Sequence, residues 1–243
     1  MLTSLTALLA PTIAFAQTSA LPEAPTLSPA PSHAYEAASA VPAAASTAAL
    51  NVCSFEWEVR ARGIALGITQ DTVRWDSNSS GVVSKFTPNA MASILGAPTV
   101  ERTWSSSKSQ GIVREENKYT SEEAPYNVRW AVKGTKMWKT VNKQPRDEFP
   151  TPAGIPGQRY IDSSVFPYLD LVGQPINAAP TQAWVLNQRD PYQATMQRTA
   201  ESAEYSAGNK RGTVWLTEGK PTKLSFSEGT EKFESTVVSS KCN

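Results

Sequence analysis

Histidine is almost absent from this sequence: among 243 residues there is one, His33. Most side chains that titrate or bind metals near neutral pH are histidines. The scarcity therefore excludes Ser-His-Asp and Cys-His hydrolases and every zinc site that needs histidine. The only two cysteines cannot supply a four-sulfur metal site. We expect no catalytic residue, no bound metal and no cofactor.

An excess of positive charge is also missing. Lys and Arg number 23 and Asp and Glu number 22, which gives a formal net charge of +1. A nucleic-acid binder must neutralise several phosphates at once with clustered Lys and Arg. The balance of charge therefore excludes nucleic acid as a partner.

Basic residues are absent from the beginning of the chain, where none precedes Arg60. Residues 1–16 form an apolar run too short to span a bilayer, and they end in Ala14-Phe15-Ala16, the small-x-small pattern that signal peptidase accepts. An export signal usually opens with a positive charge, which is missing here. The alternative is an apolar helix of the fold, although Pro11 interrupts it. We expect a signal peptide cleaved after Ala16, a periplasmic destination and no transmembrane segment in the mature chain.

Large aliphatic side chains are scarce in residues 17–50, where Ala, Pro, Ser and Thr dominate. Such a segment cannot bury enough apolar surface to offset its ordering entropy, so we expect a disordered tether. The tether contains His33, which a flexible segment cannot hold as a ligand. Residues 51–243 hold all seven Trp and both Cys and are expected to form a single β-rich domain.

The strongest pattern in this domain is an alternation of apolar and polar residues, the period of a strand with one buried face. The clearest examples are Phe55–Ala61 and Tyr126–Val132, and Gly134-Thr135 then predicts a tight hairpin into residues 136–141. Further strands are predicted at residues 69–75, 82–87, 100–106, 112–120, 183–188, 194–205, 213–217, 222–227 and 232–239. Short strands joined by short turns predict an antiparallel meander and exclude a parallel, doubly wound sheet.

Helix is expected only in short pieces. Asp162 or Ser163 is a suitable cap for a helix that runs through Val172, and residues 89–95 are expected to form another turn or two. Residues 143–158 contain several prolines and predict a long loop. Such a loop is either functional or an ordered crossover between two halves of the sheet.

Taken in order, several segments resemble a family of exported bacterial proteins known as the domain of unknown function number three-one-zero-eight. These segments are the opening strand at residues 55–61, the turn Ser107–Gly111, the stretch Gln158–Ser163 with Tyr168 and Leu169, and the closing Val214–Leu216 with Lys220–Leu224. The resemblance implies a strongly curved antiparallel sheet wrapped round a short helix, similar to periplasmic lipoprotein carriers. The expected fold is therefore mainly β, a half-barrel-like meander with one or two short helices. The resemblance carries no activity with it.

The two cysteines lie at opposite ends of the predicted domain. Cys53 comes just before the first strand and Cys242 is one residue from the last position. In an oxidising periplasm they are expected to form a disulfide that joins the two ends of the domain. The alternative is two free thiols.

Two patterns suggest chemistry, and each has a simpler interpretation. Ser105-Ser106-Ser107-Lys108 has the Ser-x-x-Lys spacing of a serine nucleophile, but it follows a strand pattern and not a helix start. Acidic pairs such as Glu115-Glu116 offer two carboxylates for glycoside hydrolysis, but neighbours on a strand point to opposite faces. We therefore interpret each pair as one solvated charge and one charge at a sheet edge.

Aromatic residues on the inner face of a curved sheet could enclose an apolar cavity, as the resemblance implies. The residues expected to line this cavity are Phe55, Trp57, Val128, Trp130 and Trp138. The alternative is an ordinary packed core. We expect a periplasmic, non-catalytic binding module for an apolar small molecule, a lipid or a lipoprotein. The alternatives are an envelope structural or assembly protein that acts through surface contacts and, last, a hydrolase.

Cleavage after Ala16 predicts that protein recovered from the periplasm of an expressing bacterium begins at Gln17. N-terminal sequencing or intact-mass measurement checks this, with unprocessed chain from the cytosol as the reference. A periplasmic chain that begins at Met1 would contradict the signal peptide and the oxidising compartment on which the disulfide argument depends.

Overall fold

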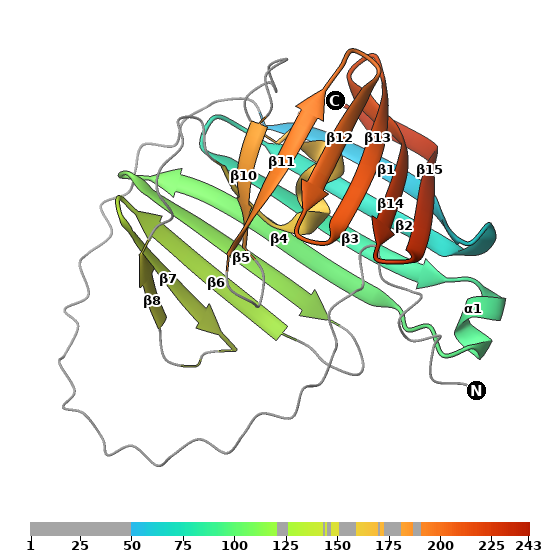
Figure 1. Cartoon of the computed structure of the whole chain (residues 1–243), viewed down its shortest axis with the longest axis horizontal. Coiled ribbons are helices and arrows are strands. Elements are labelled where there is room, and N and C mark those ends of the chain that lie inside the picture. The colour runs from blue at the N-terminus through green and yellow to red at the C-terminus, as the bar shows by residue number, and fades with distance from the viewer. Residues whose placement is uncertain are drawn as a thin grey trace.

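The structure, a computed structural model, describes residues 50–120, 126–142, 144, 147–150, 159–169, 171–172, 181–186 and 191–243. Within these ranges the chain forms 15 strands of one sheet (Figure 1). The elements in chain order are β1 (Asn51–Ala61), β2 (Ile64–Trp75), β3 (Ser79–Pro88), α1 (Ala90–Ile94), β4 (Val100–Ser109), β5 (Ile112–Thr120), β6 (Tyr126–Lys133), β7 (Lys136–Val141), β8 (Asp147–Pro150), β9 (Arg159–Ile161), the 3-10 helix η1 (Ser163–Tyr168), β10 (Thr181–Val185), β11 (Tyr192–Arg198), β12 (Ser202–Ala207), β13 (Lys210–Thr217), β14 (Lys220–Glu228) and β15 (Glu231–Cys242). The predicted mainly β fold is confirmed. The signal peptide and nearly all of the tether lie outside the described residues.

The first and last strands lie side by side in the middle of the sheet. The strand order runs from β8 down to β1, continues with β15 and then descends to β9. Two meanders therefore meet where β1 pairs with β15, and the Cys53–Cys242 disulfide joins these strands with a Cα–Cα distance of 4.1 Å. The sheet curves so strongly that β10–β14 cross in front of β3–β6, with η1 between the two layers (Figure 1).

The predicted alternation matches the burial along the strands. In β1 the inward residues Cys53, Phe55, Trp57, Val59 and Ala61 are all buried. The largest core cluster combines side chains from β1–β4 with side chains from β9–β15 and η1. Burial of this one apolar face against itself is the main force that curls the sheet.

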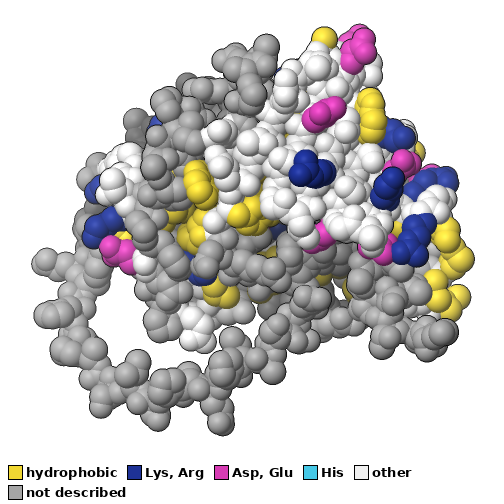
Figure 2. Space-filling model, in the orientation of Figure 1, with side chains coloured by type: hydrophobic (Ala, Val, Ile, Leu, Met, Phe, Trp, Pro, Cys, Tyr) yellow, Lys and Arg dark blue, Asp and Glu magenta, His cyan; other side chains and the backbone are white. Residues whose placement is uncertain are grey.

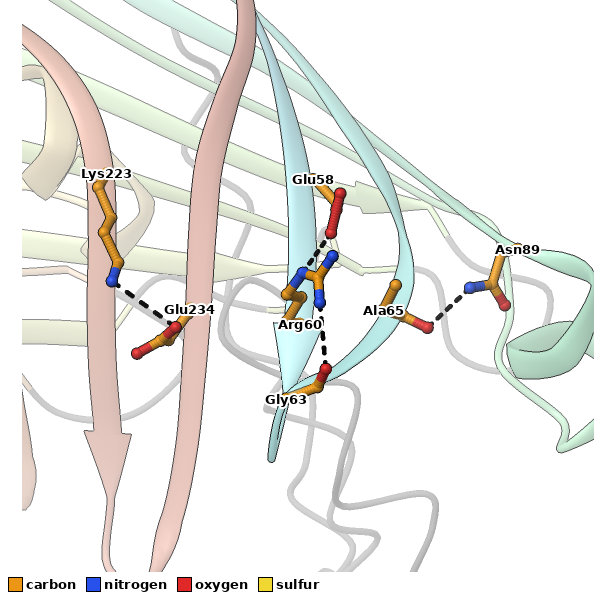
Figure 3. A network of polar contacts seen from close by, with 7 residues as sticks. All are labelled: Glu58, Arg60, Gly63, Ala65, Asn89, Lys223 and Glu234. Carbon is orange, nitrogen blue, oxygen red and sulfur yellow. Dashed lines mark hydrogen bonds and ion pairs between the residues drawn. The ribbon is translucent and has the colours of Figure 1, made fainter.

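The helix α1 closes one end of the sheet and is held there by its N-cap. The Asn89 side chain accepts a hydrogen bond from the backbone N–H of Ala92 at 2.8 Å. It also donates one to the carbonyl of Ala65 in β2 at 2.7 Å, the bond drawn in Figure 3. The predicted turn at residues 89–95 is thus confirmed, and Asn89 is its capping residue.

Four local predictions need correction. Residues 194–205 form two strands and not one, because the Thr199 hydroxyl accepts hydrogen bonds from the backbone N–H groups of Glu201 and Ser202 and so turns the chain. The expected loop at residues 143–158 contains β8, whose Pro150 is tolerated because β8 is an edge strand. The helix predicted through Val172 is the 3-10 helix η1. One neighbouring pair, β9 and β10, is parallel.

No helix in the described part of the chain is both long enough and apolar enough to cross a membrane.

Removal of the disulfide is expected to lower the free energy of unfolding by about 4 kcal/mol, because the bond closes a very long loop and so restricts the unfolded chain. The two cysteines are separated by 189 residues. Urea titration with and without reductant measures the loss, and the double variant Cys53→Ala/Cys242→Ala serves as the control that should not respond to reductant. Equal stability of oxidised and reduced protein would show that strand pairing alone closes the sheet.

Candidate functional site

Two of the residues expected to line a cavity lie in the main core. Phe55 and Trp57 are 2% and 3% exposed and pack against the Tyr168 ring of η1, with ring centroids 5.2 and 6.2 Å away. The Trp57 indole N–H also donates to the Tyr168 hydroxyl at 2.7 Å. Helix η1 therefore occupies the concavity in front of these two side chains.

Val128 and Trp130 belong to a separate core cluster. They are buried on the inner face of β6 with Val132, and Met137 of β7 and Leu186 just after β10 pack into the same cluster. The structure therefore does not bring Phe55 and Trp57 together with Val128 and Trp130 around one space.

Trp138 lies on the other face of the sheet, which corrects the expectation that it shares the inner face with Trp130. The two-residue turn pairs Val132 with Met137 and Ala131 with Trp138, so Met137 takes the buried position and Trp138 projects outward. Its indole N–H donates to the Glu148 carboxylate at 3.0 Å.

A buried polar cluster at the start of η1 was not predicted. Asp162 is fully buried and accepts hydrogen bonds from the guanidinium of Arg102 in β4 at 2.5 Å and from the amide of Asn117 in β5 at 2.6 Å. Burial, the largest single effect, lowers the pKa of Arg102, but the charge and hydrogen bond of Asp162, together with Tyr126 and Tyr119, outweigh it, so the pKa lies above its ordinary value. The cluster therefore fixes the entry to η1 against the sheet, and a buried pair of this kind is costly to break.

A second buried polar contact holds the end of η1. The Tyr168 hydroxyl donates to the Asp71 carboxylate of β2 and accepts from Trp57 of β1. Burial raises the pKa of Asp71 to about 6, although hydrogen bonds from Ser84, Tyr168 and Trp57 oppose the shift. Burial and the nearby Asp71 also raise the pKa of Tyr168, so its hydroxyl stays protonated as the donor.

Glu115 corrects our interpretation of the acidic pairs. It is 3% exposed and lies on the inner face of β5, while its neighbour Glu116 points outward. Burial raises the pKa of Glu115 well above its ordinary range, although the Trp104 indole N–H donates to its Oε1 at 2.5 Å and opposes the shift. The sequence pattern could have placed Glu115 inside, because it is two residues before Asn117 and four before Tyr119, and residues spaced by two on a strand share one face.

The interior polar groups around η1 have a structural role. Asp71, Arg102 and Asp162 are bonded to other buried side chains, and together they tie both ends of η1 to the sheet. The Ser-x-x-Lys pair gives no nucleophile, because Ser105 and Lys108 lie on β4, where an offset of three places them on opposite faces. Among the described residues, no three His, Cys, Asp or Glu side chains gather as metal ligands do.

Two grooves lie on the outer face of the sheet. The first groove has a volume of about 710 Å³ and crosses β11–β15. It is lined mainly by serines, threonines and charged residues of both signs, including Thr195, Ser206, Arg211, Thr213, Ser225 and Glu234. Figure 2 shows this front face as mostly uncharged polar atoms and backbone. The second, of about 720 Å³, crosses β4–β7 and is lined by residues that include Ser105, Arg114, Glu116, Arg129, Ala131, Lys133, Trp138 and Thr140. We call them the β11–β15 groove and the β4–β7 groove.

Apolar side chains are also exposed at the end of the molecule that carries α1. Ile94 is 85% exposed, Leu95 53%, Met91 50% and Ile64, in the β1–β2 hairpin, 53%. Hydrophobic side chains are visible at this margin in Figure 2.

No family model and no curated protein matches the chain. The chain is similar in structure to the beta-barrel-like protein of domain of unknown function DUF1849 from Brucella abortus, seen in its crystal structure. The TM-score is 0.48 and the sequence identity 8%, and the superposition covers 80% of this chain and 98% of that one. The resemblance to the family numbered three-one-zero-eight stays an expectation.

Asp71 predicts a pH dependence of stability. Its pKa is raised from 3.8 to about 6, so the folded state keeps a proton that the unfolded state loses, and stability falls as the pH rises through this window. The variant Asp71→Asn, which stays neutral, should lose about 3 kcal/mol less than the parent between about pH 4 and pH 7. Urea titrations across this range measure the difference, with Glu101→Gln at an exposed position of β4 as the control. Parallel pH profiles for parent and Asp71→Asn would contradict the assigned burial effect.

Proposed function

We propose that this protein is a non-catalytic binding module of the bacterial cell envelope that acts through the outer face of its sheet. The observation that carries the proposal is the β4–β7 groove, which has a volume of about 720 Å³. This volume falls in the range of ligand-binding clefts. The groove combines an indole, hydroxyls and charged side chains, the mixture that gives a ligand both contact area and orientation.

The packed interior supports a surface function. Four of the five residues expected around a cavity are 3% exposed or less and contact other core side chains. A ligand between the layers would have to displace η1 or open the cluster round Trp130. Both steps expose buried apolar surface and break the polar contacts of Asp162 or Tyr168, and each costs free energy.

The disulfide supports a periplasmic location. Disulfides persist in oxidising compartments, and the Cys53–Cys242 bond joins the two strands on which the whole sheet depends. The predicted signal peptide and Ala/Pro-rich tether agree with this location. A tether of this kind would let the module reach surfaces of the envelope at a distance.

Binding of an apolar small molecule, a lipid or a lipoprotein inside the sheet is the function that the resemblance implies. It predicts a saturable change in tryptophan fluorescence when a fatty acid or lipopeptide is added. It also predicts that Trp130→Ala weakens this response more than Arg129→Ala. A ligand in the β4–β7 groove would lie beside Trp138 on the outer face. The surface proposal therefore predicts that any fluorescence response is lost in Trp138→Ala and kept in Trp130→Ala, and this comparison separates the two functions.

The surface proposal predicts that the processed protein co-sediments with at least one envelope material and that a bulky residue in the β4–β7 groove blocks this. The panel is vesicles of phosphatidylethanolamine with phosphatidylglycerol, peptidoglycan sacculi, and aggregates of lipopolysaccharide. Ala131→Trp fills the groove from its floor and should weaken binding by about tenfold or more. Ser225→Trp, in the β11–β15 groove, is the matched control. Absence of binding across the panel, or equal binding by both variants and the parent, would refute the proposal.

A further inference from the structure

The β4–β7 groove has an alanine at the centre of its floor. Cross-strand pairing places Arg114 of β5 and Trp138 of β7 on either side of Ala131 of β6. Adjacent strands lie about 4.8 Å apart, so the two long side chains rise one strand away from the small one. Arg129 and Lys133 lie two residues before and after Ala131 on the same face of β6. An indole and three cations thus surround a space where the floor has only a methyl group.

The charges around Ala131 are not balanced within the groove. Of the outward-facing residues that line it, three are basic and only Glu116 is acidic. Glu116 is already engaged by Arg129 at 2.9 Å and by Lys118 at 3.6 Å. Among the described residues, Arg114 and Lys133 have no acidic partner within salt-bridge distance. The groove is therefore complementary to an anion.

The floor of the groove restricts how a ligand can be recognised. Strands β5 and β6 are inner strands of the sheet, and their backbone groups pair with β4, with each other and with β7. A peptide therefore cannot add here as an extra strand, because strand addition needs an unpaired edge. Recognition has to come from side chains, namely the indole of Trp138, the hydroxyls of Ser105, Ser107 and Thr140, and the cations.

We propose that the β4–β7 groove binds an acidic oligosaccharide, with a sugar ring over Ala131 beside Trp138 and its carboxylate between Arg114 and Lys133. The apolar C–H face of a sugar ring packs on an indole, and the sugar hydroxyls bond to serine, threonine and carboxylate groups. The guanidinium of Arg114 suits a planar carboxylate, which it can bind with two parallel hydrogen bonds. This ligand assignment rests on the proposed surface function.

The β11–β15 groove provides an internal comparison. It is of nearly equal volume and also rich in hydroxyls, but its lining holds Arg211 and Lys232 against Glu204 and Glu234. A ligand selected by negative charge should therefore prefer the β4–β7 groove.

Titration calorimetry with tetragalacturonate as the probe tests the assignment. The parent should bind it saturably, about tenfold more tightly than neutral cellotetraose, and the affinity should fall between about 50 mM and about 500 mM NaCl because the contacts are exposed ion pairs. Lys133→Glu and Arg114→Glu should each weaken the binding of tetragalacturonate by about tenfold. Trp138→Ala should weaken the binding of both oligosaccharides. Arg211→Glu, an exposed arginine of the other groove, is the matched control that should bind as the parent does. Lys133 is fully outside the core, so its variant should remain folded even if Trp138→Ala does not.

Each other outcome overturns the assignment. Equal binding of tetraglutamate or of a short single-stranded oligonucleotide would mean that the groove selects charge and not a sugar. If Lys133→Glu and Arg211→Glu both bind tetragalacturonate as tightly as the parent does, the ligand binds elsewhere on the protein. If tetragalacturonate does not bind while Ala131→Trp still blocks co-sedimentation with vesicles, the proposed surface function stands and the ligand class is wrong. If the protein binds neither tetragalacturonate nor any envelope material, the ligand assignment and the proposed surface function are both wrong.

Discussion

The pairing of β1 with β15 is the constraint on which the rest of this structure depends. Each half of the chain forms a meander in which successive strands are neighbours in the sheet, with α1 inserted between β3 and β4 and with β9 and β10 paired in parallel. Only the contact between the first and last strands joins the two halves into one sheet, and its closure involves nearly the whole domain. Long-range closure of this kind is entropically expensive. The disulfide lowers this entropy cost of folding, because it holds the two strands together even in the unfolded chain.

Once the two halves of the sheet are joined, η1 packs between them. The hydrogen bonds that hold its two ends place carboxylates in an apolar interior, and the raised pKa of Asp71 reflects the resulting desolvation. Apolar contacts alone would allow η1 to slide along the inner face. Hydrogen bonds to Arg102, Asn117 and Asp71 select one position, which is the use that buried polar groups have where packing is not specific.

Much of the local structure could be predicted because period-two alternation records which face of a strand is buried, as in β1 and β6. The polar contacts of η1 could not be predicted, because the inward-facing Asp71 and Arg102 look like charged surface until the opposite layer is known. Trp138 was misplaced for a different reason. The two-residue turn at Gly134-Thr135 already pairs Val132 with Met137, so counting through the hairpin would have put the indole outside. The candidate groove depends on that correction and on cross-strand neighbours that periodicity alone does not supply.

The two edges of the sheet affect how this protein behaves at high concentration. An open sheet ends in strands whose outer backbone groups can recruit another chain, and a sheet with many long strands offers a broad template for such growth. Among the strands that the structure describes, the two edge strands are the shortest, with four residues in β8 and three in β9, and β8 ends in Pro150, which has no N–H to donate. A second copy therefore finds little backbone to continue. Edge-to-edge growth, the usual hazard of an open sheet, is therefore limited along the described edges of this one.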